Sequence, residues 1–288
     1  MSNFVLFTDS ACDINADLLA SWGVRCIKMS YRFDGDDKNY EDGEMDITQF
    51  YNRMREGGVA KTAAINPISF TEAFEPVLKD GKDILYLCFS SALSTTFNSS
   101  KIASEELLES YPDRKILCAD TLCASAGQGL LVYLAAQKQK DGASLSEISD
   151  FVESIKPNLC HWFSVDDLVY LKRGGRVSSA VAFVGGLLGI KPVLHVDDNG
   201  ALINVSKVRG RKAALKALAD IYEDLADKSG NYPVFISHGD CIDDVTQLEN
   251  MLFERFGVKF DVITDIGAVI GAHAGPGTIA LFFIGKNR

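Results

Sequence analysis

Apolar and polar positions follow two alternating periodicities through the first half of the chain. Short apolar runs occur at residues 4–7, 84–87 and 115–118, and small polar residues follow them. Runs of this length are typical of buried strands. Apolar residues at helical spacing follow at 90–111 and 120–139, and Ser144 with Glu147 forms a capping box before a helix at 146–155. The alternation predicts a parallel α/β arrangement.

The second half of the chain has a different pattern. Asp198, Asn199 and Gly200 stand between two alternating runs, which is the short-range signal of a β-hairpin. Residues 211–228 form an amphipathic helical pattern, and apolar runs at 234–238, 259–267 and 279–285 add strands. The pattern predicts an α/β protein with two domains, 1–160 and 161–288, with a ligand at their junction.

Composition limits the classes of partner. The net charge of -10 argues against nucleic acid, whose phosphates require clustered Lys and Arg, and against tight binding to an anionic membrane surface. The longest nearly uncharged stretches, 177–190 and 266–284, are interrupted by glycines, so neither predicts a membrane span. The first residues lack the pattern of an export signal. We therefore expect a cytoplasmic protein with no stable membrane insertion.

Hydroxyl-rich turns follow the predicted strands. These turns read TDSACD at 8–13, CFSSALSTT at 88–96 and DTLCAS at 120–125, and a related segment reads KTAAINP at 61–67. Because ligands of open parallel sheets bind at the carboxyl ends of strands, we expect the four segments to supply hydroxyl and N–H donors to one crevice. Such donors at helix N-termini suit a carboxylate or a phosphate. Each turn taken alone is more often a plain helix cap, and it is the agreement of the four that indicates a binding site.

Other chemistry has weaker signals. No Walker A motif, GxSxG elbow, HExxH motif, EF-hand loop or ordered GxGxxG occurs, so the sequence indicates no metal and no cofactor. Asp9, Asp13 and Asp120 have the chemistry to hold Mg²⁺, but aspartates at strand ends are more often caps. The seven cysteines form no CxxC pair and are expected to be free thiols, mostly buried. Basic residues cluster at 172–176 and 207–216, and could form an anion or partner surface or a solvated face.

Taken in order, several of these segments resemble the motifs of one known family, the DegV proteins. The segments are TDSACDI, KTAAINP, SSALSTTFNSS, DTLCASAGQGLLV, LKRGGRVS, IKPVL, KVRGRKAA and GAVIGAHAGPGTIALFF, and they extend over essentially the whole chain. The resemblance implies an N-terminal α/β/α domain with a parallel sheet and a C-terminal two-layer α/β domain with a mixed sheet. It also implies a long-chain fatty acid in a buried tunnel, whose carboxylate is presented to a separate fatty acid kinase that forms acyl phosphate.

The resemblance also implies roles for particular residues. Thr62 and Ser94 match the hydroxyls that bind the carboxylate, and Arg176 and His273 match basic residues near the head group. Arg209 falls in the segment expected to contact a partner. This chain departs from the family pattern at Ala63 and Ala64, where serine is common, and at Thr95, where glycine is common, which bears on secondary contacts of the ligand.

The free energy of burying a hydrocarbon tail is large enough to account for tight binding of a fatty acid. At about 0.8 kcal/mol per methylene, roughly fifteen buried methylenes give on the order of 12 kcal/mol, so the tail supplies affinity and the hydroxyls fix orientation. The segment VAFVGGLLGI at 181–190 is a candidate tunnel wall or ordinary core. The leading hypothesis is a binding protein that is not an enzyme by itself. The alternatives are a stand-alone metal-dependent phosphotransferase or hydrolase using Asp9 and Asp120, and a regulatory module that senses a small anion.

Overall fold

A computed structural model describes residues 3–177 and 189–288. Its first sheet is parallel, with strand order β2-β1-β6-β7. The strands are β1 (Phe4–Asp9), β2 (Val24–Ile27), β6 (Asp83–Cys88) and β7 (Ile116–Asp120). The predicted parallel arrangement is therefore confirmed, and the fold is of the α/β class.

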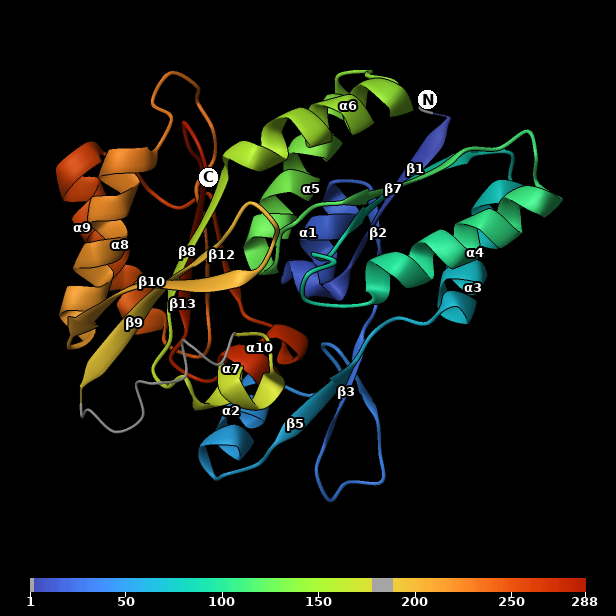
Figure 1. Ribbon diagram of the computed structural model, residues 1–288. Helices are drawn as coiled ribbons and strands as arrows, with labels where there is room; N and C mark the ends of the chain where they lie inside the picture. The colour runs from blue at the N-terminus through green and yellow to red at the C-terminus, as the bar shows by residue number, and fades with distance from the viewer. Residues whose placement is uncertain (1–2, 178–188) are drawn as a thin grey trace.

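Helices cover both faces of this sheet (Figure 1). One face packs on α3 (Pro67–Lys79) and α4 (Thr96–Ser110), and the other packs on α5 (Ser125–Lys140) and α6 (Leu145–Ile155). The predicted capping box of α6 is present, because Ser144 and Glu147 each bond the backbone of the other. Short elements follow β1, namely η1 (Ser10–Cys12) and α1 (Ala16–Ser21).

A second, small antiparallel sheet was not predicted from the sequence. It has the order β4-β3-β5, with β3 (Ser30–Phe33), β4 (Tyr40–Glu41) and β5 (Ala60–Ala63), and α2 (Ile47–Arg55) belongs to the same unit. Its aromatic core packs against Ala268 and Ala272 of α10 (Ala268–Ala274). This sheet therefore joins a segment near the N-terminus to a helix near the C-terminus.

The third sheet is mixed and has the order β10-β9-β8-β13-β11-β12. Only β11 and β12 run parallel; the other neighbours are antiparallel. The strands are β8 (Leu159–Ser164), β9 (Ile190–Val196), β10 (Leu202–Arg209), β11 (Phe235–His238), β12 (Val262–Asp265) and β13 (Ile279–Ile284). The β9–β10 pair confirms the predicted hairpin at Asp198 to Gly200.

One face of the mixed sheet packs on α8 (Arg211–Leu225) and α9 (Ile242–Phe256), which gives the expected two layers. The remaining elements near this sheet are η2 (Lys156–Asn158) and α7 (Val169–Gly174). Within the described part of the chain, no helix is both long enough and apolar enough to cross a membrane.

Helix α5 lies between the parallel and mixed sheets and contributes to a core shared by both. Every residue from Ser125 to Val132 is buried. Two glycines allow this close packing: a methyl group at Gly127 would overlap His161 of β8, and one at Gly129 would overlap Ile14 beyond η1. The mixed sheet begins at β8, near the predicted domain boundary at residue 160, but one hydrophobic core extends across both sheets. The boundary therefore stays a prediction.

Candidate functional site

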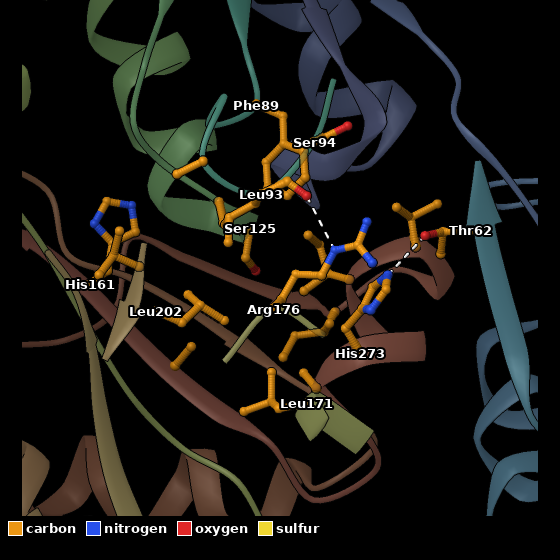
Figure 2. Close-up of a pocket in the computed structure, with 18 of the residues that line it drawn as sticks. Thr62, Phe89, Leu93, Ser94, Ser125, His161, Leu171, Arg176, Leu202 and His273 are labelled. Atoms are coloured by element: carbon orange, nitrogen blue, oxygen red, sulfur yellow. Dashed lines mark hydrogen bonds between the residues drawn. The ribbon is translucent and has the colours of Figure 1, made fainter. Parts of the chain in front are cut away.

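A cavity of about 350 Å³ lies where the parallel sheet, the mixed sheet and α10 meet. Its wall includes apolar side chains from both halves of the chain, among them Phe89, Leu93, Leu171 and Leu202 (Figure 2). Three of the four hydroxyl-rich segments reach it, through Thr62, Ser94 and Ser125. The expectation of one crevice at the strand ends is therefore supported for these segments.

The cavity has an exposed end and a closed end. Arg176, Ala64, Ser91 and Thr95 line it and are exposed residues, whereas the lining residue His161 is only 1% exposed. Figure 2 shows His161 on the opposite side of the cavity from Thr62 and His273. A molecule in the cavity therefore has one end near the surface and the other in the protein interior.

Thr62 and His273 meet at the exposed end. Thr62 lies on β5 and His273 on α10, and the Thr62 Oγ1 and His273 Nε2 atoms are 2.8 Å apart. Burial, with a smaller contribution from the charge of Arg176, lowers the pKa of His273 from 6.5 to about 4. The imidazole is therefore neutral at neutral pH and keeps one N–H donor.

Gly174 allows the His273 ring to take this position. A methyl group at Gly174 would overlap Nδ1 of His273. Nδ1 is buried and has no hydrogen-bond partner in the described residues. Nδ1 therefore packs against Gly174, and it is the Nε2 edge of the ring that pairs with Thr62.

Arg176 supplies the positive charge at the same end. Its Nε donates to the carbonyl oxygen of Leu93 over 3.3 Å, and Nη1 donates to the carbonyl oxygen of Gly174. In Figure 2 the guanidinium lies between Leu93 and the His273 ring. Arg176 thus joins the β6–α4 loop to the end of α7 and brings a cation to the exposed end of the cavity.

Ser94 lines the cavity and also bonds the turn that leads into α4. Its Oγ lies 2.9 Å from Thr96 Oγ1 and accepts from the backbone N–H of Thr96 over 3.2 Å, at the start of α4. Thr96 Oγ1 in turn accepts from the N–H of Ile65, over 3.3 Å. Ser94 therefore lines the cavity and bonds the turn just before α4, whose N-cap is Thr95 and carries no side-chain cap bond, and the N-terminus of α4 faces the same end as Thr62.

Comparison with known proteins identifies the family. A family model described as "Uncharacterised protein, DegV family" matches residues 3–286. A DegV domain-containing protein of Clostridium perfringens is 47% identical, with 100% of this chain and 99% of that protein covered. The chain belongs to the DegV family. The fold and family implied by the sequence motifs are thus confirmed.

Solved DegV structures share the fold. A structure from Streptococcus agalactiae, described as a fatty acid binding DegV family protein, is 29% identical with a TM-score of 0.86 and covers 100% of both chains. A structure from Eubacterium ventriosum, described as a stearic acid-binding protein, is 25% identical with a TM-score of 0.88 and covers 98% of both chains.

The first hydroxyl-rich segment of this DegV protein does not line the cavity, contrary to the expectation for TDSACD. Asp9 is fully buried and accepts from Tyr86 Oη, over 2.6 Å, and from the N–H of Phe89, over 2.9 Å. Its carboxylate therefore fixes the start of the β6–α4 loop that carries Ser94. The short aspartate side chain bonds its own loops and does not reach the cavity.

Asp13 does not line the cavity but bonds residues that do or that lead into α10. Its carboxylate accepts from Ser125 Oγ and, over 2.9 Å, from the N–H of Gly267. Burial raises the pKa of Asp13 well above its usual value, and nearby Asp42, which accepts from the N–H of Ala268 over 3.0 Å, adds to the shift. Two buried carboxyl groups therefore position the first turn of α10, the helix that carries His273.

Both aspartates of the metal-enzyme alternative, Asp9 and Asp120, accept hydrogen bonds from backbone N–H groups. Asp120 accepts from the N–H groups of Ser91 and Leu122, each over 3.1 Å, and the oxygens of Asp9 are engaged as described. No group of three or more His, Cys, Asp or Glu side chains with metal-site geometry occurs in residues 3–177 and 189–288.

The sequence did not single out His161 as a cavity residue, whereas Ser125 belongs to one of the hydroxyl-rich segments expected there. Adjacent residues of a strand face opposite sides, and accordingly His161 lines the cavity while Cys160 bonds the carbonyl oxygen of Asn287. Burial raises the pKa of the Cys160 thiol to about 12, which is unfavourable for a thiolate nucleophile. The alternation of side chains along β8 predicts that Cys160 and His161 lie on opposite faces of the sheet, but it does not predict which face lines a cavity.

Arg209 is not among the residues that line the cavity. It is exposed at the end of β10, whereas Leu202, which lines the cavity, begins that strand. Seven residues of strand correspond to roughly 23 Å. The role of Arg209 in contacting a partner stays a prediction, and so do the roles of Thr62, Ser94, Arg176 and His273 in binding a ligand.

The candidate tunnel wall VAFVGGLLGI, residues 181–190, lies outside the described residues except for Gly189 and Ile190.

Proposed function

We propose that this DegV protein binds one long-chain fatty acid in the cavity, with the carboxylate at the exposed end beside Thr62 and His273. The observation that carries the proposal is the distribution of polar groups along an otherwise apolar cavity. Two hydroxyls, a neutral imidazole and a guanidinium gather at the exposed end. The buried part of the wall is mainly apolar, with Phe163 and Phe282 among its members and His161 and Ser125 as polar exceptions. This distribution matches a molecule with one anionic head and a long apolar tail.

The head-group end offers what a carboxylate requires. Thr62 and Ser94 carry hydroxyls, His273 keeps an N–H donor while neutral, and Arg176 is cationic. Bonds from charged donors to carboxylates are roughly twice as strong as neutral ones. The start of α4 adds the positive end of a helix dipole. Together these groups fix the orientation of the carboxylate.

The interior is suited to the tail. A volume of about 350 Å³ lies within the range of roughly 300 to 1,000 Å³ for small-molecule sites. Each buried methylene contributes about 0.8 kcal/mol, so the tail dominates affinity. The descriptions of the Streptococcus and Eubacterium structures as fatty-acid-binding and stearic acid-binding proteins support the same ligand class.

We further propose that the bound carboxylate is presented to a separate kinase, which forms acyl phosphate. The exposure of Arg176, Ser91 and Thr95 supports this, because the head-group end is the end that another protein can reach. The DegV protein then supplies binding and orientation, and the kinase supplies nucleotide and phosphoryl transfer.

The proposal is tested by native mass spectrometry of the purified protein, which should retain one long-chain fatty acid. Ala280→Phe fills the cavity and should exclude stearic acid, whereas Ala63→Phe, an exposed neighbour of Thr62 that does not line the cavity, should not. Melting curves check that both variants fold. A protein that retains no fatty acid and binds none when titrated, or that turns over a phosphate ester with added Mg²⁺, would overturn the proposal.

A further inference from the structure

The turn that carries Ser94 is organised by one buried residue, Ser90, which does not itself line the cavity. The carbonyl oxygen of Ser90 accepts from the N–H of Leu93, over 3.0 Å, and from the N–H of Ser94, over 3.2 Å. Its own N–H donates to the carbonyl oxygen of Cys123 over 2.9 Å. Ser90 therefore holds the part of the β6–α4 loop that brings the Ser94 hydroxyl to the exposed end of the cavity.

The side chain of Ser90 links this turn to the other half of the chain. Its Oγ donates to the carbonyl oxygen of Gly200, over 2.9 Å, and accepts from the N–H of Ala92, over 3.3 Å. Gly200 lies at the tip of the β9–β10 hairpin, which also contributes Val196 and Leu202 to the cavity wall. Because Ser90 is fully buried, water cannot take the place of either bond.

The hairpin tip is held where Ser90 meets it. Gly200 has a left-handed backbone, with a φ of 78°, and a methyl group there would overlap Ser90 Oγ. Arg288 donates to the carbonyl oxygen of Asp197, in the tip, over 3.3 Å, and to that of Leu122, in the β7–α5 loop, over 2.7 Å. The tip is thus bonded to the loops of the parallel-sheet half by Ser90 and by Arg288.

The turn at Ser90 also holds the cation of the site. Arg176 Nε donates to the carbonyl oxygen of Leu93, and the N–H of Leu93 donates to Ser90. Figure 2 shows Leu93, Ser94 and Arg176 together at this end of the cavity. A shift of the turn would therefore move both the Ser94 hydroxyl and the guanidinium of Arg176.

We propose that Ser90 is a positioning residue for carboxylate binding. Through its bond to Gly200, the β9–β10 hairpin holds the turn at 90–94 in the conformation that presents Ser94 and Arg176 to the head group. This inference rests on the proposed fatty acid function and adds to it a residue that acts without touching the ligand.

The test compares stearic acid with octadecan-1-ol, whose neutral head group gains less from a hydroxyl and a guanidinium than a carboxylate does. Ser90→Ala should lower the affinity for stearic acid roughly three- to tenfold, and that for the alcohol less than about twofold. Ser100→Ala is the matched control, because Ser100 is a buried serine whose hydroxyl donates to the carbonyl oxygen of Phe97 in its own helix, over 2.7 Å. This control should bind both ligands as the wild type does.

A double-mutant cycle tests the route through the hairpin. Arg288 bonds the hairpin tip and the β7–α5 loop, so Arg288→Ala should loosen the tip and lower the affinity for stearic acid. In a Ser90→Ala background the same change should add little, because the link from the tip to the turn is already lost. Carboxyl-¹³C-labelled stearic acid gives a second readout: its bound resonance should shift in both single variants and stay unchanged in Ser100→Ala.

Equal loss of affinity for the acid and the alcohol in Ser90→Ala would overturn the inference, since Ser90 would then only maintain the cavity as a whole. Wild-type affinity for both ligands, or a full effect of Arg288→Ala in the Ser90→Ala background, would do the same. Should melting curves show that Ser90→Ala does not fold, Arg288→Ala decides, because chain ends tolerate substitution, and an unchanged ratio of the two affinities would refute the proposal. Failure of the wild-type protein to bind either ligand would instead contradict the proposed function itself.

Discussion

The Thr62 hydroxyl lies 2.8 Å from the His273 imidazole although 211 residues separate the two in the chain. One comes from the small sheet near the N-terminus and the other from α10, which packs on that sheet. Their pairing therefore depends on the sheet that the sequence patterns did not predict. It also places a hydroxyl and a neutral imidazole where the proposed ligand carries its charge.

Removing the hydroxyls should affect position more than affinity. Thr62→Val and Ser94→Ala should each weaken fatty acid binding by about 1 to 3 kcal/mol, because the buried methylenes dominate binding. Kinase-dependent formation of acyl phosphate should fall more severely, since the carboxylate loses its fixed orientation. Thr62→Ser, which keeps the hydroxyl, should be much less affected. Normal binding and full phosphorylation in both variants would return these residues to the role of turn and cap.

A methyl group at Gly174 should displace the His273 ring. Gly174→Ala should lower the free energy of unfolding by about 1 to 3 kcal/mol, as overpacking does, and weaken fatty acid binding. The backbone of Gly174 is outside the left-handed region, so alanine adds no conformational strain. In a His273→Ala background the stability loss should be much smaller. An unchanged loss in a double-mutant cycle would mean that the ring is not the group that is displaced.

Stability should depend on pH through His273. Its pKa is 6.5 in the unfolded chain and about 4 in the folded protein, so between these values the unfolded chain binds more protons. The free energy of unfolding therefore rises with pH through this window and its contribution is complete above pH 6.5. Denaturant titrations of the wild type and His273→Gln should differ by an amount that grows by on the order of 3 kcal/mol across the window. A pH-independent difference would contradict the assignment.

Asp13 should tolerate asparagine better than alanine. Its backbone is left-handed, with a φ of 52°, a region in which asparagine is common and alanine is disfavoured. Asparagine also keeps an acceptor for the N–H of Gly267 and can pair with Ser125. We expect Asp13→Ala to cost on the order of 3 kcal/mol in the free energy of unfolding, and Asp13→Asn about 1 kcal/mol. Equal losses in chemical denaturation would show that the carboxylate itself is required.

Charge reversal at Arg209 separates partner binding from ligand binding. Because this residue is exposed and lies away from the cavity wall, Arg209→Glu should leave the fatty acid content unchanged. Kinase-coupled turnover should weaken if this end of β10 contacts the kinase. Measured together, lipid content by mass spectrometry and acyl phosphate formation distinguish the two effects. Loss of lipid would assign Arg209 to folding or to the pocket instead.

The sequence predicted those elements that are determined by residues close together in the chain. The hairpin at Gly200, the capping box at Ser144 and the parallel strands each follow from residues close in the chain. The small sheet was missed because β4 has only two residues and the order β4-β3-β5 depends on contacts with α10.

For the candidate site too, the sequence could place some residues and not others. The hydroxyl turns that contain Ser94 and Ser125 could be placed at one crevice, because they follow strands of the parallel sheet and such strand ends share an edge. Thr62 reaches the same crevice from β5 of the small antiparallel sheet, for which the sequence provides no such reason. The sequence could not predict which way the side chains of Asp9 and Asp13 point, because their hydrogen-bond partners, Tyr86 and Gly267, are distant in the chain. The same applies to His161, whose place at the closed end depends on Gly127 in another helix.

The position of α5 between two sheets limits how the molecule can move. Because its buried turns belong to one core shared by both halves, hinge opening between those halves would break that core and expose apolar surface. Exchange of a bound ligand should therefore proceed by local fluctuation of the loops around Ser91 and Arg176. On heating, the two halves should melt in a single calorimetric transition, with equal van't Hoff and calorimetric enthalpies.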